Sequence, residues 1–386
     1  MVAHRIVMVM VCDFKFLTPA HNEGLILAER GFQVDVYTLK DKDEPENERL
    51  SNNYYIHRIY LWSRFLPKSP FFLLIKYTEY VLRFFLMEAH HKASIYVAHN
   101  FDALIFTYVM ARLKGAKIVY RAHELYTEAF KLPFISFWRW LESQLLKRVD
   151  TTITPNDERA EIMYVEYGAK VKPTVVMNCP RYKPPIFSTL LQDYLKEQGY
   201  TEQFIVLFQG RLVSYNGVEE LISAAQYFED GIKLILIGPI TLEYLKQLEA
   251  NIKQLALKDK VLIHESVPYA DLPQITASAN IGVVLYRNIN RNSYFCAPNK
   301  LFEYFMAGLP VISSNFPGLI QLVENEGCGL VVDPDNPQKI AAAVNFIYSN
   351  PEKAELMKKN TLISAQKYNW ENESKKLIWV YESLLG

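Results

Sequence analysis

Short apolar runs alternate with longer amphipathic stretches through the first half of the chain. The runs are rich in valine and isoleucine and predict strands at 6–12, 34–39, 56–61, 95–98, 118–121, 151–154 and 174–177. Apolar residues at helical spacing between them predict helices at 23–30, 72–90, 102–113 and 137–148. Gly31 and Gly115 follow two of these helices, where a left-handed residue commonly closes the last turn. This alternation is typical of a parallel sheet that carries helices on both faces.

A polar stretch interrupts the alternation near residue 180, with Pro180, Pro184 and Pro185 close together. Beyond it, the same pattern predicts strands at 204–209, 233–237, 261–264, 281–285, 311–314 and 329–332. Helices are predicted between them at 217–228, 242–257, 269–277, 298–307 and 337–348. The sequence therefore predicts an α/β protein with two Rossmann-like, doubly wound domains. Ligands of such sheets bind at the carboxyl ends of the strands, so we expect the chemistry there, in a cleft that the two domains face.

Composition agrees with this organisation and narrows the class of protein. The chain has 386 residues, too many for one ordinary core, and its 42 Lys and Arg balance its 42 Asp and Glu. Neutrality disfavours a general nucleic-acid binder. The four cysteines are scattered without CxxC spacing, which indicates free thiols in a reducing compartment and no metal site. The apolar run at 4–12 is short and lacks a cleavage site, so we predict a strand rather than a signal peptide and a cytoplasmic location.

A Gly-Arg turn follows the first strand of the second half. Gly210 and Arg211 come directly after an apolar run, and a helical pattern begins near Gly217. An arginine at the carboxyl end of a strand can bind a phosphate with two parallel hydrogen bonds, and the free amides of the next helix can add to this. The alternative is an ordinary surface arginine.

The stretch "PNKLFEYFMAGLP" places charged residues at the start of a predicted buried helix. Pro298 suits the first helical position, so the amides of Asn299, Lys300 and Leu301 would be free to bind an anion beside the Lys300 ammonium. Glu303 lies about one turn further on, and a carboxylate there suits a pair of hydroxyls. These groups together fit a nucleoside diphosphate. The alternative is a partly buried Glu303 that pairs with Lys300 or with an arginine.

Several segments then resemble one enzyme family. "GRLVSYNGVEELISA", "LILIGPI", "LPQITASANIGVVLY" and "PNKLFEYFMAGLPVISSNFPGL" are similar, in order and spacing, to the carboxyl half of retaining glycosyltransferases of family 4, which have the GT-B fold. "VYRAHELYTEAF" and "VDTTITPNDERAEIMYVEYGAKVKPTVVMNCP" resemble their amino half. The resemblance implies an acceptor-side domain at 1–180, a linker at 181–203 and a nucleotide-sugar domain at 204–365. It also implies a helix at 366–386 that crosses back onto the amino domain.

The resemblance also implies roles for individual residues. Arg211 would bind the donor pyrophosphate, Glu303 the donor ribose, and His123 would face the sugar and the acceptor. With Lys300, these three form the implied catalytic set. The implied donor-binding residues are Gly210, Arg211, Asn216, Gly217, Gly238, Ser266, Val267, Pro298, Asn299, Lys300, Leu301 and Glu303. The implied acceptor-side residues are His99, His123 and Glu124. Either histidine could instead have a purely structural role.

The sequence departs from the family pattern at three points. Asn216 stands where the family commonly has a lysine, so we expect Lys300 to supply that charge. Phe295 stands where the family often has a second glutamate against the donor sugar, which leaves the sugar open. The usual glycine pair after the first strand is absent.

The reaction implied is transfer of a sugar from a UDP- or GDP-type donor to an acceptor hydroxyl, with retention of anomeric configuration. The leaving phosphate would take the acceptor proton, so neither a metal nor a cofactor besides the nucleotide sugar is expected. The implied setting is cell-surface glycan or polysaccharide assembly. Two alternatives remain, a nucleotide-sugar epimerase of the same fold and a non-catalytic nucleotide-sugar-binding homologue. A nicotinamide oxidoreductase is disfavoured because no GxGxxG follows a strand.

Aromatic residues, 13% of the chain, gather in two segments at 65–92 and 131–148. Lys76, Glu79 and Arg83 interrupt the first at helical spacing, so it is not expected to span a bilayer. We favour two amphipathic helices packed on the amino-terminal sheet. The alternative is a peripheral contact with the inner face of the membrane, in which Phe84 and Phe85 would face outward and the acceptor would be a lipid-linked sugar.

Overall fold

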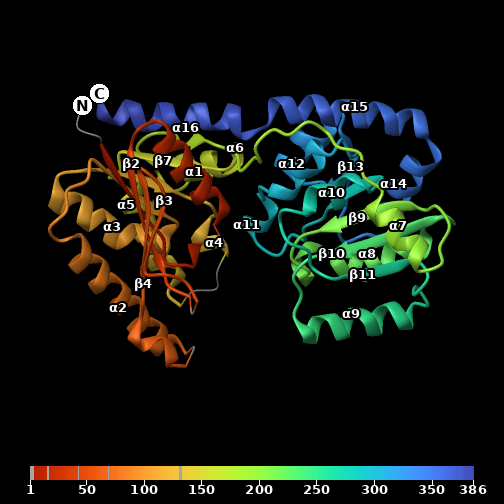
Figure 1. Cartoon of the computed structure of the whole chain (residues 1–386), viewed down its shortest axis with the longest axis horizontal. Helices are drawn as coiled ribbons and strands as arrows, with labels where there is room; N and C mark the ends of the chain where they lie inside the picture. The colour runs from red at the N-terminus through yellow and green to blue at the C-terminus, as the bar shows by residue number, and fades with distance from the viewer. Residues whose placement is uncertain (1–3, 15–16, 42, 68, 130–132) are drawn as a thin grey trace. The chain divides into compact units, whose positions relative to one another are not determined.

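The protein is described by a computed structural model that covers residues 4–14, 17–41, 43–67, 69–129 and 133–386. The chain forms two compact units. The first contains Met1–Met177 and Glu373–Gly386, and the second contains Asn178–Asn372. Figure 1 shows the helices and strands of both units.

The first unit is built on an eight-stranded sheet in the order β3-β4-β2-β1-β5-β6-β7-β8. The strands are β1 Arg5–Val9, β2 Gln33–Leu39, β3 Asn47–Ser51, β4 Tyr54–Ile59, β5 Ile95–His99, β6 Lys117–Arg121, β7 Thr151–Thr154 and β8 Thr174–Val175. All neighbours are parallel except β3 and β4, which form an antiparallel edge. The strand order reverses between β1 and β5, which pair in the register Ile6↔Ile95. This reversal is the point at which sheets of this class bind ligands.

Helices cover both faces of this sheet. They are α1 Thr18–Glu29, α2 Pro70–Glu88, α3 Phe101–Lys114, α4 Tyr126–Ala129, α5 Ile135–Leu146 and α6 Asp157–Val165, with a short 3-10 helix, η2, at Trp62–Phe65. Figure 1 shows α2, α3 and α5 on one side of the sheet and α1 on the other. Because both faces are covered, β1 and β5 bury nearly every residue, which explains their uninterrupted apolar sequences.

The second unit contains a six-stranded parallel sheet in the order β11-β10-β9-β12-β13-β14. Its strands are β9 Phe204–Gln209, β10 Ile232–Ile237, β11 Val261–His264, β12 Ile281–Val284, β13 Val311–Ser314 and β14 Gly329–Val332. Its helices are α7 Leu190–Glu197, α8 Val218–Ala224, α9 Leu242–Gln254, α10 Leu272–Ala277, α11 Arg291–Tyr294, α12 Asn299–Met306, α13 Pro317–Leu319, α14 Pro337–Ser349 and α15 Pro351–Lys367. Short turns η3 Ser214–Asn216, η4 Ala225–Tyr227 and η5 Ile320–Glu324 connect them. The strand order reverses between β9 and β12.

The last helix, α16 Trp370–Leu385, belongs to the first unit from Glu373 onward. The Glu373 carboxylate accepts a hydrogen bond from the Met177 amide at 2.9 Å. The Tyr381 hydroxyl donates to Glu23 of α1, and the other oxygen of Glu23 lies 3.2 Å from Arg121 in a fully buried ion pair. These bonds hold the end of the chain on α1 and β6.

The differences from the predicted elements have local causes. The edge strand β3, sequence NERLS, was not predicted because it is mostly exposed and has no apolar face. Residues 181–203, predicted as a linker, contain α7, which buries Leu191 and Leu195. The glycine caps are confirmed, since Gly31 and Gly115 have φ of 92° and 64°.

Candidate functional site

The site in the second unit begins where β9 and β10 end together. The Gly210 amide donates to the Ile237 carbonyl at 2.9 Å, and both Gly210 and Gly238 have positive φ, 118° and 152°. A Cβ on Gly238 would lie 1.9 Å from the Gly210 carbonyl oxygen, so any side chain there is excluded. The two glycines let two turns lie back to back at the carboxyl edge of the sheet.

The turn after Gly210 holds the arginine at the surface. Arg211 is exposed, and no ion pair to its guanidinium occurs in the described parts of the chain. Asn216 is buried, and its amide nitrogen donates to the Arg211 carbonyl at 2.8 Å. Asn216 therefore stabilises the turn that carries Arg211. Gly217 ends the turn with φ of 66°, and a Cβ there would lie 2.9 Å from Leu285 Cβ.

Helix α12 is anchored over the reversal point by Tyr304. Its hydroxyl accepts from the Gln209 amide at 3.0 Å and donates to the Leu207 carbonyl at 3.2 Å. Gly282 of β12 leaves room for the ring, since a Cβ there would lie 2.5 Å from it. The buried contact fixes the start of α12 beside the ends of β9 and β12.

The start of α12 differs from the prediction by one residue. Pro298 has ψ of 124°, which is extended rather than helical, so it is the N-cap and the helix begins at Asn299. The Leu301 amide already donates to the Pro298 carbonyl at 3.3 Å. Of the three amides predicted to be free for an anion, those of Asn299 and Lys300 therefore remain the candidates.

Lys300 is the most unusual charge in this unit. The side chain is 8% exposed, and its ammonium has no hydrogen-bond partner among the described residues. The nitrogen lies 3.8 Å from the centre of the Phe208 ring and 5.3 Å from that of Tyr286. Burial lowers the pKa of Lys300 to about 7, although Cys296 and Glu303 oppose this shift. A buried ammonium without a partner is costly unless a ligand supplies an anion.

Glu303 is hydrogen-bonded to neutral side chains, rather than held in an ion pair with Lys300 or an arginine. Its carboxylate accepts from the Gln209 side-chain amide at 2.6 Å and from the Tyr269 hydroxyl at 3.1 Å. The side-chain oxygen of Gln209, Oε1, in turn accepts from the Thr276 hydroxyl at 2.8 Å. Burial raises the pKa of Glu303, and the bonds from Gln209 and Tyr269 and the charge of Lys300 oppose that rise. The carboxylate is therefore held in one orientation by two neutral donors.

Gln209 and Tyr269 were not predicted from the sequence. Gln209 is the polar last residue of a buried strand, FIVLFQ, and that position was a usable signal. Tyr269 was placed inside a predicted helix at 269–277, but α10 begins at Leu272. The residue is therefore in the loop after β11, together with Ser266 and Val267, and this loop reaches Glu303. Phe295, at the end of α11, contacts Tyr294 with ring centres 4.9 Å apart.

The first unit brings the two predicted histidines together. His99 is the last residue of β5, and His123 follows β6 by two residues. Their nitrogens, Nδ1 of His99 and Nε2 of His123, are 2.9 Å apart. The His123 amide donates to Asn100 Oδ1 at 3.1 Å, and Arg159 donates to the His123 carbonyl. Glu124 is the next residue and is partly buried.

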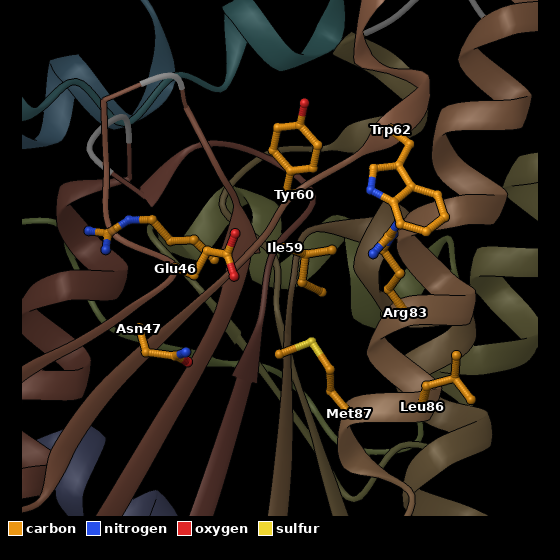
Figure 2. Close-up of a pocket in the computed structure, with 9 residues that line it drawn as sticks. Glu46, Asn47, Ile59, Tyr60, Trp62, Arg83, Leu86 and Met87 are labelled. Carbon is orange, nitrogen blue, oxygen red and sulfur yellow. The ribbon is translucent and has the colours of Figure 1, made fainter.

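A separate hollow of about 400 Å³ lies in the first unit between β3, the end of β4 and α2 (Figure 2). It is lined by Glu46, Asn47, Arg58, Ile59, Tyr60, Trp62, Arg83, Leu86 and Met87. Arg83 lies under the Trp62 ring at 4.3 Å and pairs with Glu79 at 2.8 Å. Glu46 and Arg58 also have ion-pair partners, at 3.2 Å and 2.6 Å. Every charged group of this hollow is thus already neutralised.

Helix α2 agrees at Phe84 with the favoured interpretation, a helix packed on the sheet, and not with the membrane alternative. Phe84 is fully buried and packs edge-on against Tyr37 and Phe106, so it belongs to the core and not to an outward face. The exposed large apolar residues of this helix are instead Phe71, Leu73, Leu74, Ile75, Leu82, Leu86 and Met87. Within the described ranges, no helix combines the length and the apolar character needed to cross a bilayer.

The described residues contain no group of three or more His, Cys, Asp or Glu side chains arranged to hold a metal ion. No disulfide links the cysteines within the described ranges.

Comparison with known proteins identifies the family. The amino half, residues 23–180, matches the family model for Glycosyltransferase Family 4, and residues 193–362 match the model for Glycosyl transferases group 1. The protein YtcC of Bacillus subtilis, whose own assignment as a glycosyltransferase is provisional, is 24% identical over 97% of this chain and 91% of its own.

Solved structures show the same fold. Sucrose-phosphate synthase from Thermosynechococcus elongatus superposes with a TM-score of 0.81 at 21% identity, over 99% of both chains. HepE of Anabaena, solved in complex with UDP-glucose, superposes with a TM-score of 0.75 at 16% identity, over 98% of this chain and 100% of its own. The two family models follow one another along the sequence as the two sheets do, and the chain belongs to the family 4 glycosyltransferases with the GT-B fold.

Proposed function

We propose that the protein transfers a sugar from a nucleoside diphosphate sugar to an acceptor hydroxyl, with retention of configuration. The observation that carries this proposal is Lys300, a buried cation at the carboxyl edge of a doubly wound sheet, with no hydrogen-bond partner for its ammonium in the part of the chain that the structure describes. A diphosphate supplies the missing anion. Arg211, exposed after β9, can bind the same group, and the amides of Asn299 and Lys300 add donors.

Glu303 gives the site its preference for a nucleoside over a bare diphosphate. Each carboxylate oxygen can accept a further hydrogen bond beyond those from Gln209 and Tyr269. A ribose diol supplies two such donors. Gly238 and the loop with Ser266 and Val267 lie around the same edge and would contact the rest of the nucleoside. The HepE structure contains UDP-glucose, which supports a donor of the UDP type, with GDP as the alternative base.

The chemistry follows from these charges. The bond between the anomeric carbon and the phosphate oxygen breaks while the acceptor oxygen bonds to the same face of that carbon. The acceptor proton passes to a phosphate oxygen, so the protein needs no separate base. Lys300 and Arg211 stabilise the negative charge on the leaving diphosphate, which is the largest electrostatic change in the reaction. Side chains and amides supply this stabilisation without a metal ion.

The first experiment measures donor binding and its products. UDP-glucose, UDP-galactose, GDP-mannose and other nucleotide sugars are titrated calorimetrically into the wild type and into Lys300→Met. We expect one nucleotide class to bind the wild type and to bind the variant at least tenfold more weakly. Equal affinity for the two proteins would overturn the assignment of the site. Incubation with donor alone distinguishes an epimerase, which would convert the donor sugar, from a transferase.

The acceptor is a sugar, free or lipid-linked, in cell-surface glycan assembly. Phe71, Leu74, Leu82 and Leu86 expose apolar surface on one helix of the first unit, which supports contact between α2 and the inner face of the membrane. Lys76 has its ammonium bonded to the Leu66 carbonyl, and Arg83 pairs with Glu79, so this contact would depend more on apolar burial than on headgroup charge.

Vesicle sedimentation tests this contact. Wild-type protein should bind vesicles of phosphatidylglycerol and phosphatidylcholine, and Leu74→Asp with Leu82→Asp should abolish binding without changing the melting temperature. Leu356→Asp, an equally exposed position on α15 of the second unit, is the control. A wild type that binds neither anionic nor neutral vesicles would leave a soluble sugar as the acceptor.

A further inference from the structure

The two histidines of the first unit form a hydrogen bond that lies in the plane of both rings. The ring planes differ by 12° and the ring centres are 5.2 Å apart, while His99 Nδ1 and His123 Nε2 are 2.9 Å apart. With a nitrogen contact this short, centres this far apart require the rings to lie edge to edge, because rings stacked face to face would bring their centres closer together. The contact therefore has the geometry of a linear N–H···N bond.

Both rings are neutral around physiological pH. Burial, with a smaller contribution from the charge of Arg121, lowers the pKa of His99 to about 3. Burial also lowers the pKa of His123, with further contributions from Arg121, His99 and Arg159. A neutral imidazole carries one proton, so one of its nitrogens donates and the other accepts.

The shared bond couples the two protons. If His123 Nε2 donates, His99 must carry its proton on Nε2, and both rings are the Nε2–H tautomer. If His99 Nδ1 donates, His123 must carry its proton on Nδ1, and both rings are the Nδ1–H tautomer. The outer nitrogens, His99 Nε2 and His123 Nδ1, are therefore always one donor and one acceptor.

The outer nitrogens point to a ligand rather than to a completed structural pair. Both nitrogens are buried and lack a hydrogen-bond partner among the described residues. The exposed fraction is only 1% for His99 and 8% for His123. Buried polar atoms are nearly always satisfied unless a ligand or water completes them. The pair also lies at the carboxyl ends of β5 and β6, close to the reversal point of the sheet.

We propose that His99 is a positioning residue that couples its own tautomer to that of His123, so that a sugar hydroxyl at His123 Nδ1 meets a donor or an acceptor whose state both rings share. A hydroxyl can both donate and accept a hydrogen bond, so it can bond His123 Nδ1 whether or not that nitrogen carries the proton. The tautomer that the bound hydroxyl stabilises in His123 is then also the tautomer of His99. This inference rests on the proposed function, because it takes the ligand of His123 to be a sugar.

Nuclear magnetic resonance of the full chain, labelled with ¹⁵N-histidine, tests the coupling directly. In the wild type, His99 and His123 should show the same tautomer, either both Nδ1–H or both Nε2–H. Opposite tautomers would overturn the proposal, because they leave two protons or two lone pairs facing each other across 2.9 Å. The measurement needs no substrate, so it is decided independently of whether transfer activity is found.

Two variants of matched size sharpen the test. His99→Leu removes the bond, so the tautomer of His123 no longer depends on His99 and its ¹⁵N shifts should change, while the signals of His4 and His264 stay unchanged. His99→Asn can still bond to His123 Nε2 and should leave the ¹⁵N shifts of His123 closer to those of the wild type. In a transfer assay, His99→Leu should lower kcat about tenfold with little change in the donor KM, and His99→Asn should restore most of it. A His123 spectrum unaffected by His99→Leu would also refute the coupling. If that variant does not fold, the wild-type tautomers still decide.

Discussion

The two units place polar groups at the same edge of similar sheets but give them opposite electrostatic character. In the second unit, Lys300 is buried, has no hydrogen-bond partner among the described residues, and lies beside Gly210, the residue before the exposed Arg211. In the first, His99 and His123 are buried as a neutral pair, because burial and the charge of Arg121 disfavour protonation. A shared fold therefore does not decide what the carboxyl edge of its sheet binds. The side chains placed at that edge decide it, here a buried lysine and an exposed arginine in one unit and a neutral pair of histidines in the other.

This contrast matches the two halves of the proposed reaction. A diphosphate needs fixed cations, and an acceptor or transferred sugar needs groups that donate and accept without charge. The hollow beside α2 has neither property, since its charged groups are already paired. We therefore expect its variants to leave donor affinity unchanged.

The largest effect is expected from removing the unmet charge. Lys300→Met fills the same space without the ammonium, so transfer should slow by about a hundredfold to a thousandfold, as for loss of one preorganised electrostatic group. The melting temperature should stay constant or rise, because the variant no longer buries a cation. Steady-state kinetics and a melting curve measure both. Lys246→Met, an exposed lysine on α9, is the control, and equal turnover in the two variants would remove Lys300 from the site.

The carboxylate should matter next most. Glu303→Gln keeps the shape but weakens acceptance from the ribose, so the donor Kd should rise about tenfold to a hundredfold, as for a hydrogen bond to a charged group. Tyr269→Phe removes only one orienting bond and should raise Kd a few-fold. Calorimetry with the nucleotide sugar measures both, with Glu243→Gln on α9 as the control. A Tyr269→Phe effect larger than that of Glu303→Gln would place the tyrosine, not the glutamate, on the ligand.

The pH dependence of donor binding separates the two units. The free Lys300 has a pKa of about 7, and a bound diphosphate raises it, so binding takes up a proton above that pH. The affinity should therefore fall about tenfold per unit as the pH rises above about 7, until it reaches the pKa of the complex. Calorimetry in buffers of different ionisation enthalpy measures how many protons are taken up when the donor binds. Lys300→Met should give a flat profile, and a flat wild-type profile would contradict the assignment. The histidines should add no inflection near neutral pH, because their pKa values lie far below it.

The smallest effect is expected at Asn216. Its amide holds the turn that carries Arg211, and loss of one such bond costs about 1 kcal/mol. Asn216→Ala should therefore raise the donor KM about fivefold and leave kcat nearly unchanged. Ser214→Ala in the same turn is the control. A loss of turnover as large as that of Lys300→Met would mean that Asn216 contacts the diphosphate itself.

Most strands could be predicted because a parallel strand covered on both faces is apolar at nearly every position. Runs such as FIVLFQ of β9 and IKLILI of β10 show this requirement directly. The edge strand β3 was not predicted because it is exposed to solvent and lacks an apolar pattern. Helix α7 was not predicted because it buries only Leu191 and Leu195, too few apolar residues to give a clear helical pattern among the polar residues around them. Arg211, Lys300 and Glu303 could be singled out because each is a charge in an otherwise apolar or turn-forming context.

The hydrogen bonds that orient these residues could not be predicted from the sequence pattern, because they join residues far apart in the chain. Glu303 is oriented by Gln209, 94 positions earlier, and His99 meets His123 across two adjacent strands. Residue type and local spacing thus establish the two sheets, the family and the charges available at their edges. Which charge is paired and which is left for a ligand depends on contacts between distant segments. Packing of α12 against β9 buries the Lys300 ammonium beside Phe208, where none of the described residues gives it a hydrogen bond. Burial of that kind depends on the tertiary structure and cannot be read from the local sequence.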